Sequence, residues 1–384
     1  MKRILSLLAA LALCLCFVFP AAAADAASAG LKFKPDGTFK IIHVSDTQDF
    51  ILSGQITQEF LYDLARTEKP DLFVLTGDNV STGGASGFPK LFANLLVRLS
   101  VDNLMRAFDR IYCDFGIPVT MVFGNHDNEV GPDKVTRAEQ FAMYEKHPSF
   151  KGYYLPAADE GTEDDQGQHY GTHNIIVKDK TGTTPVFNLW MFDSGSYDPV
   201  AGGYSCVQPA QIAWFNTTNA ALGLPSFAFQ HIIVKEINGL LTADQKLPAG
   251  TPGELRESPC PSKGNHGQFD ALSAGGVLAL FVGHDHTNTF EFRGMPGKTD
   301  LVNSPCTGFG SYGDADLRGA RVITLQEDMT YDTGIVTFQA FYPENTLRGA
   351  RLGMYQLMST PATLLDWISF APLLCLLRLF SIKV

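Results

Sequence analysis

Six short apolar runs, most of them ending at a polar motif, are the feature that most constrains how this chain can fold. Each run is bounded by a turn signal and has the composition of a buried strand. Stretches with helical periodicity lie between the runs. The alternation of strands and helices predicts an α/β layered fold with a mainly parallel interior. The runs are Phe39–Ser45, Leu72–Thr76, Val119–Phe123, Val186–Phe192, Phe227–Phe229 and Val277–Val282.

Three helices are predicted between these strands. Ile56, Phe60 and Leu64 share one helical face. Leu91, Leu95 and Leu99 share the apolar face of a second helix, which continues towards Leu104 and Phe108. Such a stripe is typical of a helix that packs on a sheet. A third helix is expected over Pro209–Leu222, because proline suits the first turn of a helix.

Five segments carry side chains that bind metal ions, and most of them follow an apolar run. In layered α/β folds ligands gather beyond the carboxyl ends of the strands, which is where these segments fall. One segment alone is weak evidence, but five in sequence indicate a catalytic centre. They are Asp46-Thr47-Gln48, Gly77-Asp78-Asn79, Gly124-Asn125-His126-Asp127, His231 and Gly283-His284-Asp285-His286.

Two adjacent divalent ions need a bridging carboxylate surrounded by oxygen and imidazole ligands. Asp78 is the expected bridge, because it follows a strand and a glycine that lets the backbone approach the ions. The i, i+2 spacing in two segments projects both side chains to the same side of an extended chain. We expect Asp46, Gln48 and His286 to bind the first ion, and Asn125, His231 and His284 to bind the second.

His126 is left without a metal, beside a predicted ligand. An imidazole in that place can protonate a leaving oxygen or stabilise charge on a phosphoryl group. Asp127 is expected to hold the tautomer of His126 through a hydrogen bond. The nucleophile would be a hydroxide that bridges the metals, whose charge lowers the pKa of bound water. His126 and Asp127 are therefore the predicted catalytic residues.

These motifs resemble the calcineurin-like metallophosphoesterase family, which includes the purple acid phosphatases. Further segments, such as Phe192–Tyr197 and Thr307–Gly310, look like the Dcr2-like and purple-acid-phosphatase-like branch. The resemblance covers roughly residues 38–345. It implies a four-layer α/β/β/α sandwich of two mixed sheets, with a dimetal site at the carboxyl-terminal edge of the strands. It also implies two divalent or mixed-valence ions, manganese, iron or zinc.

Two positions depart from the family pattern. Gln48 stands where the family usually has histidine, and a neutral amide oxygen favours manganese or iron over zinc. Some relatives that act on nucleotide diphosphates carry glutamine there. Ser81 stands where purple enzymes have tyrosine, so no iron–tyrosinate colour is expected.

The N-terminus predicts export, and the C-terminal tail has an open role. Residues 1–24 have the basic start, apolar run and small-residue end of a signal peptide, and residues 31–345 form the predicted catalytic domain. Residues 346–384 form a tail whose apolar stretch Ala362–Leu379 has three open interpretations. It could be an interfacial helix in contact with a membrane, a helix packed on the domain, or a removable anchor signal.

Charge and cysteine content narrow the partners further. The formal net charge of −11 argues against nucleic acid, because binding a phosphate backbone needs a basic surface. The expected partner is a small phosphorylated substrate, and the oligomeric state leaves no trace in the sequence. A disulfide between Cys206 and Cys260 is one hypothesis for an exported chain, and free thiols are the other.

Together these patterns predict an exported, metal-dependent phosphoester hydrolase that acts on phosphomonoesters. Two alternatives remain. One is a phosphodiesterase or nucleotide pyrophosphatase, which Gln48 favours. The other is a metal-binding protein that has lost catalysis and acts by interaction, which the intact His126 argues against.

Overall fold

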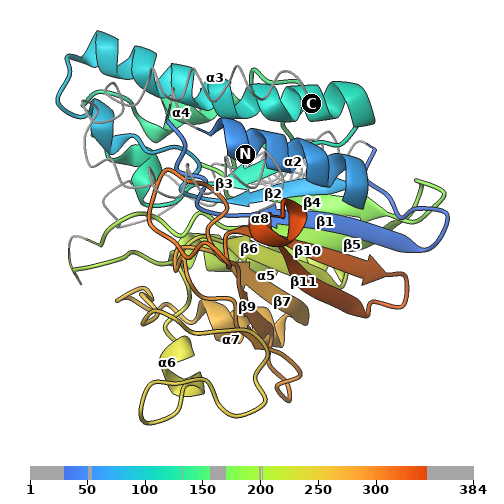
Figure 1. Cartoon of the computed structure of the whole chain (residues 1–384). Coiled ribbons are helices and arrows are strands. Elements are labelled where there is room, and N and C mark those ends of the chain that lie inside the picture. The colour runs from blue at the N-terminus through green and yellow to red at the C-terminus, as the bar shows by residue number, and fades with distance from the viewer. Residues whose placement is uncertain are drawn as a thin grey trace, which may run out of the picture.

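Two β-sheets pack face to face, and helices cover their outer faces, in the computed structural model of the chain (Figure 1). The structure describes residues 30–50, 54–131, 133–155, 170–198, 200 and 202–343. The first sheet has the strand order β11-β10-β1-β2-β3, and the second has the order β4-β5-β6-β7-β9-β8. This arrangement confirms the predicted α/β/β/α sandwich of two mixed sheets.

The first sheet is parallel on one side of β1 and antiparallel on the other. β1 pairs with β2, and β2 with β3, in parallel, whereas β10 runs antiparallel to β1 and to β11. Alternate residues of β1 face opposite sides of the sheet. Phe39 and Ile41 lie in the core between the sheets, while Ile42 and Val44 lie in the core under the helices. The strands are β1 (Thr38–Val44), β2 (Leu72–Thr76), β3 (Val119–Val122), β10 (Gly319–Gln326) and β11 (Tyr331–Thr337).

The second sheet has a parallel interior formed by β5, β6, β7 and β9, with antiparallel strands β4 and β8 at its edges. The predicted parallel interior is thus confirmed in the second sheet, whereas the first sheet has the antiparallel strand β10 in its interior. The six predicted strands agree with the observed ones closely at both ends. The edge strands were not predicted from periodicity. The strands are β4 (His173–Lys178), β5 (Pro185–Met191), β6 (Ser226–Gln230), β7 (Val277–Val282), β8 (Glu291–Phe292) and β9 (Asp300–Asn303).

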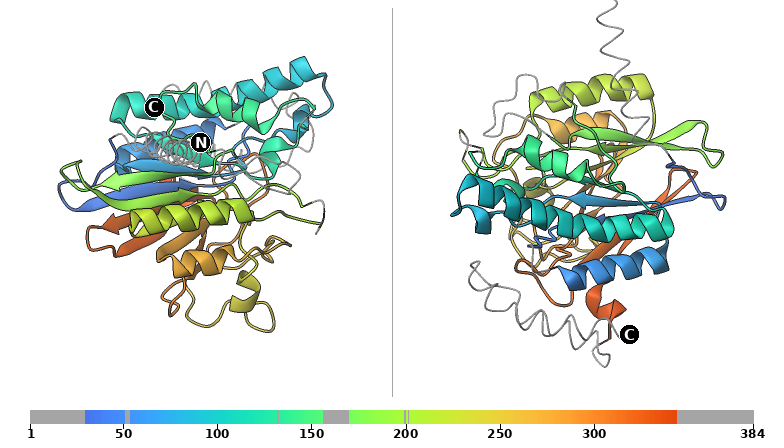
Figure 2. Two further views of the ribbon diagram at one scale, coloured as in Figure 1. Left: turned by 180° about the vertical axis from the view of Figure 1, so that it is seen from behind. Right: turned by 90° about the horizontal axis from the view of Figure 1, so that it is seen from above.

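Helices close the sandwich on both sides (Figure 2). Residues of α2 (Gln55–Glu68), α3 (Lys90–Phe115) and α4 (Arg137–Tyr144) share a core with the first sheet. Residues of α5 (Pro209–Leu222) and α7 (Gln268–Ala274) share the other core with the second sheet. The remaining helices are short: η1 (Gly83–Ala85), η2 (His126–Asn128), α6 (Ile237–Leu240) and α8 (Phe338–Phe341). The helix predicted over Pro209–Leu222 is confirmed with its bounds.

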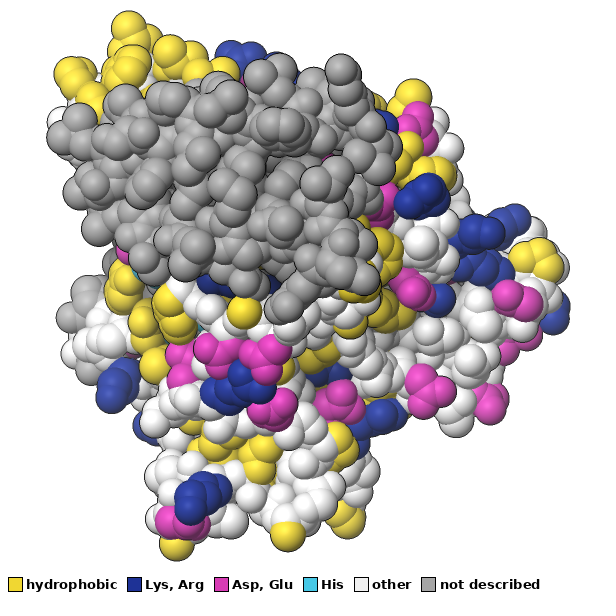
Figure 3. All heavy atoms as spheres, viewed as in Figure 1, with side chains coloured by type: hydrophobic (Ala, Val, Ile, Leu, Met, Phe, Trp, Pro, Cys, Tyr) yellow, Lys and Arg dark blue, Asp and Glu magenta, His cyan; other side chains and the backbone are white. Residues whose placement is uncertain are grey.

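The first turns of α3 present the opposite face to the one predicted. Leu91 is 86% exposed and Leu95 is 46% exposed, whereas Leu96 and Val97 are buried against the sheet. Figure 3 shows the hydrophobic side chains that gather on this outer surface. The helix carries two apolar stripes, and periodicity alone cannot tell which of them meets the sheet. The prediction was wrong for Leu91 and Leu95, although the buried positions further along, such as Leu104, were predicted correctly.

His43 shows how the two sheets accommodate a polar group between them. Its ring is fully buried, with Nε2 2.6 Å from the Thr76 hydroxyl and Nδ1 2.8 Å from the Ser304 hydroxyl. The rings of Phe229 and Phe281 pack edge-on against it. Burial lowers the pKa of His43 to about 3, and the charge of Arg321 acts in the same direction.

Several predictions concern parts of the chain that lie outside the described residues, namely the signal peptide at residues 1–24 and the tail at residues 346–384. Within the described ranges, no helix has both the length and the apolar character needed to cross a membrane. The disulfide hypothesis is wrong in this structure, because Cys206 and Cys260 are both free thiols. Cys206 is buried while Cys260 is exposed on the loop that precedes α7.

Candidate metal centre

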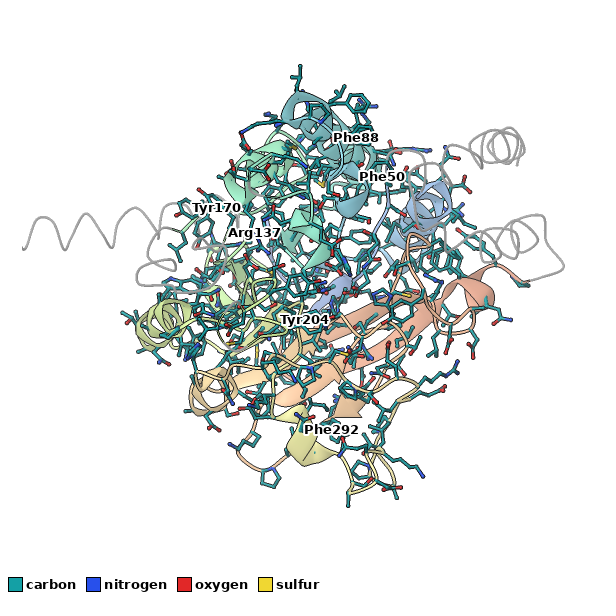
Figure 4. The ribbon with its side chains drawn as sticks, turned by 90° about the vertical axis from the view of Figure 1, so that its left-hand side faces the viewer. Phe50, Phe88, Arg137, Tyr170, Tyr204 and Phe292 are labelled. Carbon is teal, nitrogen blue, oxygen red and sulfur yellow. The ribbon has the colours of Figure 1, made fainter. Side chains whose placement is uncertain are left out.

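The five predicted segments meet at one end of the sandwich. The parallel strands β1, β2 and β3 end there together, and so do β6 and β7 of the opposite sheet. Because each segment follows one of these strands, their side chains converge from both sheets on the gap between them. This end lies on the left in Figure 1 and faces the viewer in Figure 4, where Tyr204 is labelled close to it.

The first group of donors surrounds the carboxylate of Asp46. Nε2 of His286 lies 3.3 Å from Oδ1 of Asp46. Donor atoms of Asp46, Asp78 and His286 all lie within 4.8 Å of one another, and all three residues are buried. The side-chain amide of Gln48 joins them, with its nitrogen 3.0 Å from Oδ2 of Asp78. The structure therefore brings together the four residues predicted for the first ion and the bridge.

The second group of donors surrounds the ring of His231. Nε2 of His231 is 3.3 Å from Oδ2 of Asp78 and 3.1 Å from Oδ1 of Asn125. Nδ1 of His284 is 3.2 Å from the same nitrogen of His231. These are the residues predicted for the second ion, and Oδ2 of Asp78 contacts a member of each group. The bridging role of Asp78 stays a prediction.

Backbone carbonyls orient two of the imidazoles. Nδ1 of His231 lies 2.8 Å from the carbonyl oxygen of Thr76, and Nδ1 of His286 lies 2.9 Å from that of Tyr312. A carbonyl can only accept a hydrogen bond, so each Nδ1 carries a proton, and Nε2 is the ring nitrogen that faces the centre. This is the arrangement in which proteins hold histidine as a metal ligand.

The backbone at the centre adopts conformations that folded chains rarely tolerate. Asp46, Gln48, Asp78 and His284 all have positive φ values, of 53°, 44°, 49° and 72°. Left-handed conformations at residues other than glycine carry strain and cluster at functional sites. Gly77, with φ of 90°, lets the loop before Asp78 pass close to the loop after β3, since a Cβ atom at Gly77 would lie 2.6 Å from the backbone nitrogen of Gly124.

The donor set fits divalent cations. Oδ1 of Asp46, Nδ2 of Asn125 and Nε2 of His284 are buried and, within the described part of the chain, have no hydrogen-bond partner. Two carboxylates, two amides and three imidazoles face one another here, and bound cations would satisfy the unpaired oxygen of Asp46 and ring nitrogen of His284. Burial acts to raise the pKa of Asp46, but the nearby rings of His286 and His231 outweigh it and hold the pKa below its ordinary value. Metal binding itself stays a prediction.

His126 lies at the rim of this cluster and makes a different contact from the one predicted. Its ring is partly exposed, with Nε2 3.9 Å from Oδ2 of Asp78 and Nδ1 2.7 Å from Oε1 of Glu129. Burial lowers the pKa of His126, but the hydrogen bond that its ring donates to Glu129 and the charge of Asp78 prevail and raise the pKa to about 9.

Contrary to the prediction, Asp127 does not contact the His126 ring. One oxygen of its buried carboxylate accepts hydrogen bonds from the backbone nitrogens of Asn79 and Val80, at 2.9 and 3.0 Å. The other oxygen accepts one from the backbone nitrogen of Gly124, at 2.8 Å. The η2 turn directs the side chain of Asp127 into the protein, where it ties the loop after β2 to the loop after β3.

Three residues around the centre were not predicted. Glu129 is one, although its spacing of three residues from His126 on a helical turn is a signal that could have identified it. Tyr312 stacks on His286, with the ring centroids 4.2 Å apart, and Tyr204 packs edge-on against His284 at 4.3 Å. The two tyrosines come from irregular loops, for which the sequence offers no such signal.

Comparison with known proteins agrees with this geometry. A model of the calcineurin-like phosphoesterases matches residues 39–288, which is more than half of the chain. A protein of Arabidopsis thaliana named "Probable inactive purple acid phosphatase 29" is 29% identical over 338 residues, covering 77% of this chain and 78% of its own length. The phosphatase DCR2 of Saccharomyces cerevisiae is 25% identical over 299 residues, covering 70% of this chain and 47% of its own.

Solved structures include a dimetal phosphatase from Danio rerio, which covers 78% of this chain and 99% of its own at 13% identity, with a TM-score of 0.44. The family assignment rests on the match over residues 39–288 rather than on this likeness. With distant similarity to purple acid phosphatases and yeast DCR2 over most of its length, the chain belongs to the calcineurin-like phosphoesterase family.

Proposed function

We propose that this protein is an active, metal-dependent phosphoester hydrolase that prefers phosphomonoesters. The observation that carries the proposal is the partly exposed ring of His126, whose Nε2 faces the donor cluster beside Asp78 without being one of the converging ligands. A purely structural metal site has no use for an accessible imidazole at its rim. A hydrolase uses such a group to protonate the leaving oxygen.

The residues divide the chemical work. Asp46, Gln48, Asp78 and His286 would hold one ion, and Asp78, Asn125, His231 and His284 the other. Two bound divalent ions would lower the pKa of water at the site and stabilise the negative charge of the phosphoryl group. His126 would face the leaving oxygen, and the left-handed loops at Asp46 and Asp78 would keep the carboxylates aimed inward.

Two other functions have a specific observation in their favour. The amide of Gln48 lies inside the cluster, 3.0 Å from Asp78, so this departure from histidine touches the chemistry and favours a diesterase or nucleotide pyrophosphatase. Relatives such as "Probable inactive purple acid phosphatase 29" are named as inactive, which favours a protein that binds metal without catalysis. The ligands gathered here and the presence of His126 support the catalytic alternative.

Hydrolysis assays on the purified mature chain test the proposal. An aryl phosphate monoester and the matching diester are supplied with manganese, iron or zinc, beside an Asp78→Asn variant as control. We expect monoester turnover that the variant loses. We also expect His126→Ala to lower turnover by about 10²–10⁴-fold while the metal content stays unchanged. Preference for the diester would support the Gln48 alternative, and two bound metals without any turnover would support the non-catalytic one.

Location and partners belong to the same proposal. We infer export from the basic and apolar start of residues 1–24, and a small phosphorylated substrate from the family and the site. Contact with a membrane through Ala362–Leu379 is the remaining inference, and it rests on sequence alone. N-terminal sequencing of the protein recovered from culture medium or periplasm would show whether residues 1–24 have been removed.

A further inference from the structure

Glu129 makes a contact with His126 that the ligand set does not explain. Both side chains belong to one local structure, since Glu129 directly follows the η2 turn that begins at His126. The carboxylate oxygen Oε1 lies 2.7 Å from Nδ1 of the ring, on the side away from the donor cluster. Nε2 is the ring nitrogen that faces Asp78. The ring is thus held at one nitrogen and directed inward at the other.

We propose that Glu129 is the positioning residue for His126 in phosphoester hydrolysis. A carboxylate accepts hydrogen bonds, so it places a proton on Nδ1 and fixes the rotation of the ring. In the imidazolium form the other nitrogen, Nε2, also carries a proton and points it at the place where a leaving oxygen would form. This inference rests on the proposed function, because it assumes that His126 protonates the leaving group.

In the hydrolysis step one bond to phosphorus forms and another breaks. The oxygen of a water molecule bonds to phosphorus and that water gives up a proton to solvent. The bond between phosphorus and the leaving oxygen breaks, and its electron pair stays on that oxygen. The Nε2 proton of His126 moves to the leaving oxygen, and Nε2 keeps the lone pair. Glu129 remains hydrogen-bonded to Nδ1 throughout, and solvent later returns a proton to Nε2.

Neighbouring segments hold both members of the pair. The carbonyl oxygen of His126 accepts a hydrogen bond from the Thr82 hydroxyl at 2.9 Å, which fixes the backbone of the turn. Gly83 leaves room for Glu129, because a Cβ atom there would lie 2.8 Å from its Oε2 atom. Asp127, the adjacent carboxylate, cannot take this role, since it is occupied by three backbone nitrogens. Glu129 is therefore the carboxylate that the turn offers to the ring.

The contact is too exposed to serve mainly as a stabilising ion pair. The His126 side chain is 38% exposed and the Glu129 side chain is 30% exposed. Pairs at the surface contribute little to stability, because water screens the charges and two side chains must be immobilised. A role in orienting the ring therefore predicts that replacing Glu129 changes the chemistry of the site and leaves folding intact.

Substrates whose leaving groups differ in basicity distinguish a positioning role of Glu129 from a structural one. 4-Nitrophenyl phosphate releases a stable phenolate that needs no proton, whereas an alkyl phosphate releases an alkoxide that does. For Glu129→Ala we expect kcat for the alkyl substrate to fall by roughly 10- to 100-fold, with a small change for the nitrophenyl substrate. Glu129→Gln, whose amide oxygen can still accept from Nδ1, should fall between wild type and Glu129→Ala. The exposed Glu145→Gln, at the end of α4, is the matched loss of charge.

A second variant displaces Glu129 without removing it. Gly83 has an ordinary backbone conformation, so Gly83→Ala should be tolerated and should push the end of the Glu129 side chain aside. We expect the same dependence on the leaving group in weaker form. An equal loss for both substrates in Glu129→Ala would overturn the positioning role, because a distorted site would slow both reactions alike.

A readout that needs no turnover keeps the failure of this inference apart from the failure of the proposed function. In ¹⁵N-labelled full-length protein we expect the His126 ring to show a hydrogen-bonded Nδ1–H signal. This signal should disappear in Glu129→Ala and persist in Glu145→Gln. If it persists in Glu129→Ala, the inference is wrong even where wild type hydrolyses monoesters. If wild type has no activity but the signal behaves as expected, the proposed function is wrong although Glu129 still orients the ring. The part of the inference that concerns catalysis is then overturned together with the proposed function.

Discussion

Replacing Asp127 should affect folding, because its carboxylate joins two loops through three backbone hydrogen bonds. In Asp127→Ala the nitrogens of Asn79, Val80 and Gly124 lose their acceptor inside the protein. Each unsatisfied buried donor costs about 1–3 kcal/mol. The alanine variant no longer buries a carboxylate, which offsets part of the cost of the three donors, so we expect the free energy of unfolding to fall by roughly 3–6 kcal/mol. Asp127→Asn keeps two of the three bonds and should lose about 1–3 kcal/mol.

Urea unfolding followed by circular dichroism measures these differences. The protein is treated with a chelator first, so that metal binding does not contribute to the unfolding free energy. Asp133→Asn, an exposed aspartate on the loop before α4, is the control and should stay within about 0.5 kcal/mol of wild type. This role of Asp127 is refuted if Asp127→Asn unfolds like wild type and instead slows the alkyl substrate selectively, as predicted for Glu129→Ala. Asp127 would then serve the His126 ring as first expected.

Three further predictions follow from the fold and the site. The pKa of His43, about 3, lies below its ordinary value near 6.5, so as the pH falls only the unfolded chain takes up this proton. Stability that is present above about pH 6.5 should therefore be lost on acidification, by about 2 kcal/mol at pH 5, and urea unfolding of His43→Gln should lack this part of the pH dependence. Gly77→Ala should lower both the metal content and the thermal stability, since its Cβ would meet the backbone of the loop after β3. Metal analysis and thermal melting measure these effects, and a normal metal content would contradict the close approach. Leu91→Ala should change the unfolding free energy by less than about 0.5 kcal/mol, whereas Leu104→Ala should cost about 2–5 kcal/mol. Equal effects at the two leucines would mean that α3 is rotated from the orientation described.

Strand positions and the ligand segments could be predicted from sequence because both depend on local patterns. A short apolar run such as Leu72–Thr76 is buried on both faces, so its composition alone marks it as a strand. The side chains after it, including Asp78, fall at a predictable edge because parallel strands end together. The edge strands β8 and β11 could not be found in this way, since Glu291–Phe292 is too short and Tyr331–Thr337 is only half-buried.

The orientation of α3 shows a limit of periodicity. Leu91, Leu95 and Leu99 form a regular apolar stripe, and so do the residues that are actually buried. The choice between them depends on how the chain leaves the loop after β2 and on what α2 and α4 already cover. Contacts between distant segments decide this, and no local pattern contains them.

The sequence by itself determined which side chains converge, because aspartate, asparagine, glutamine and histidine after the ends of parallel strands meet at one edge of the sandwich. The tertiary structure alone decided which carboxylate serves His126. Asp127 and Glu129 both lie close enough to His126 in the sequence to contact its ring. The η2 turn points Asp127 into the protein towards three backbone nitrogens and leaves Glu129 beside the ring. The direction of a side chain on a single turn depends on the backbone that surrounds it, and those neighbours come from distant parts of the chain.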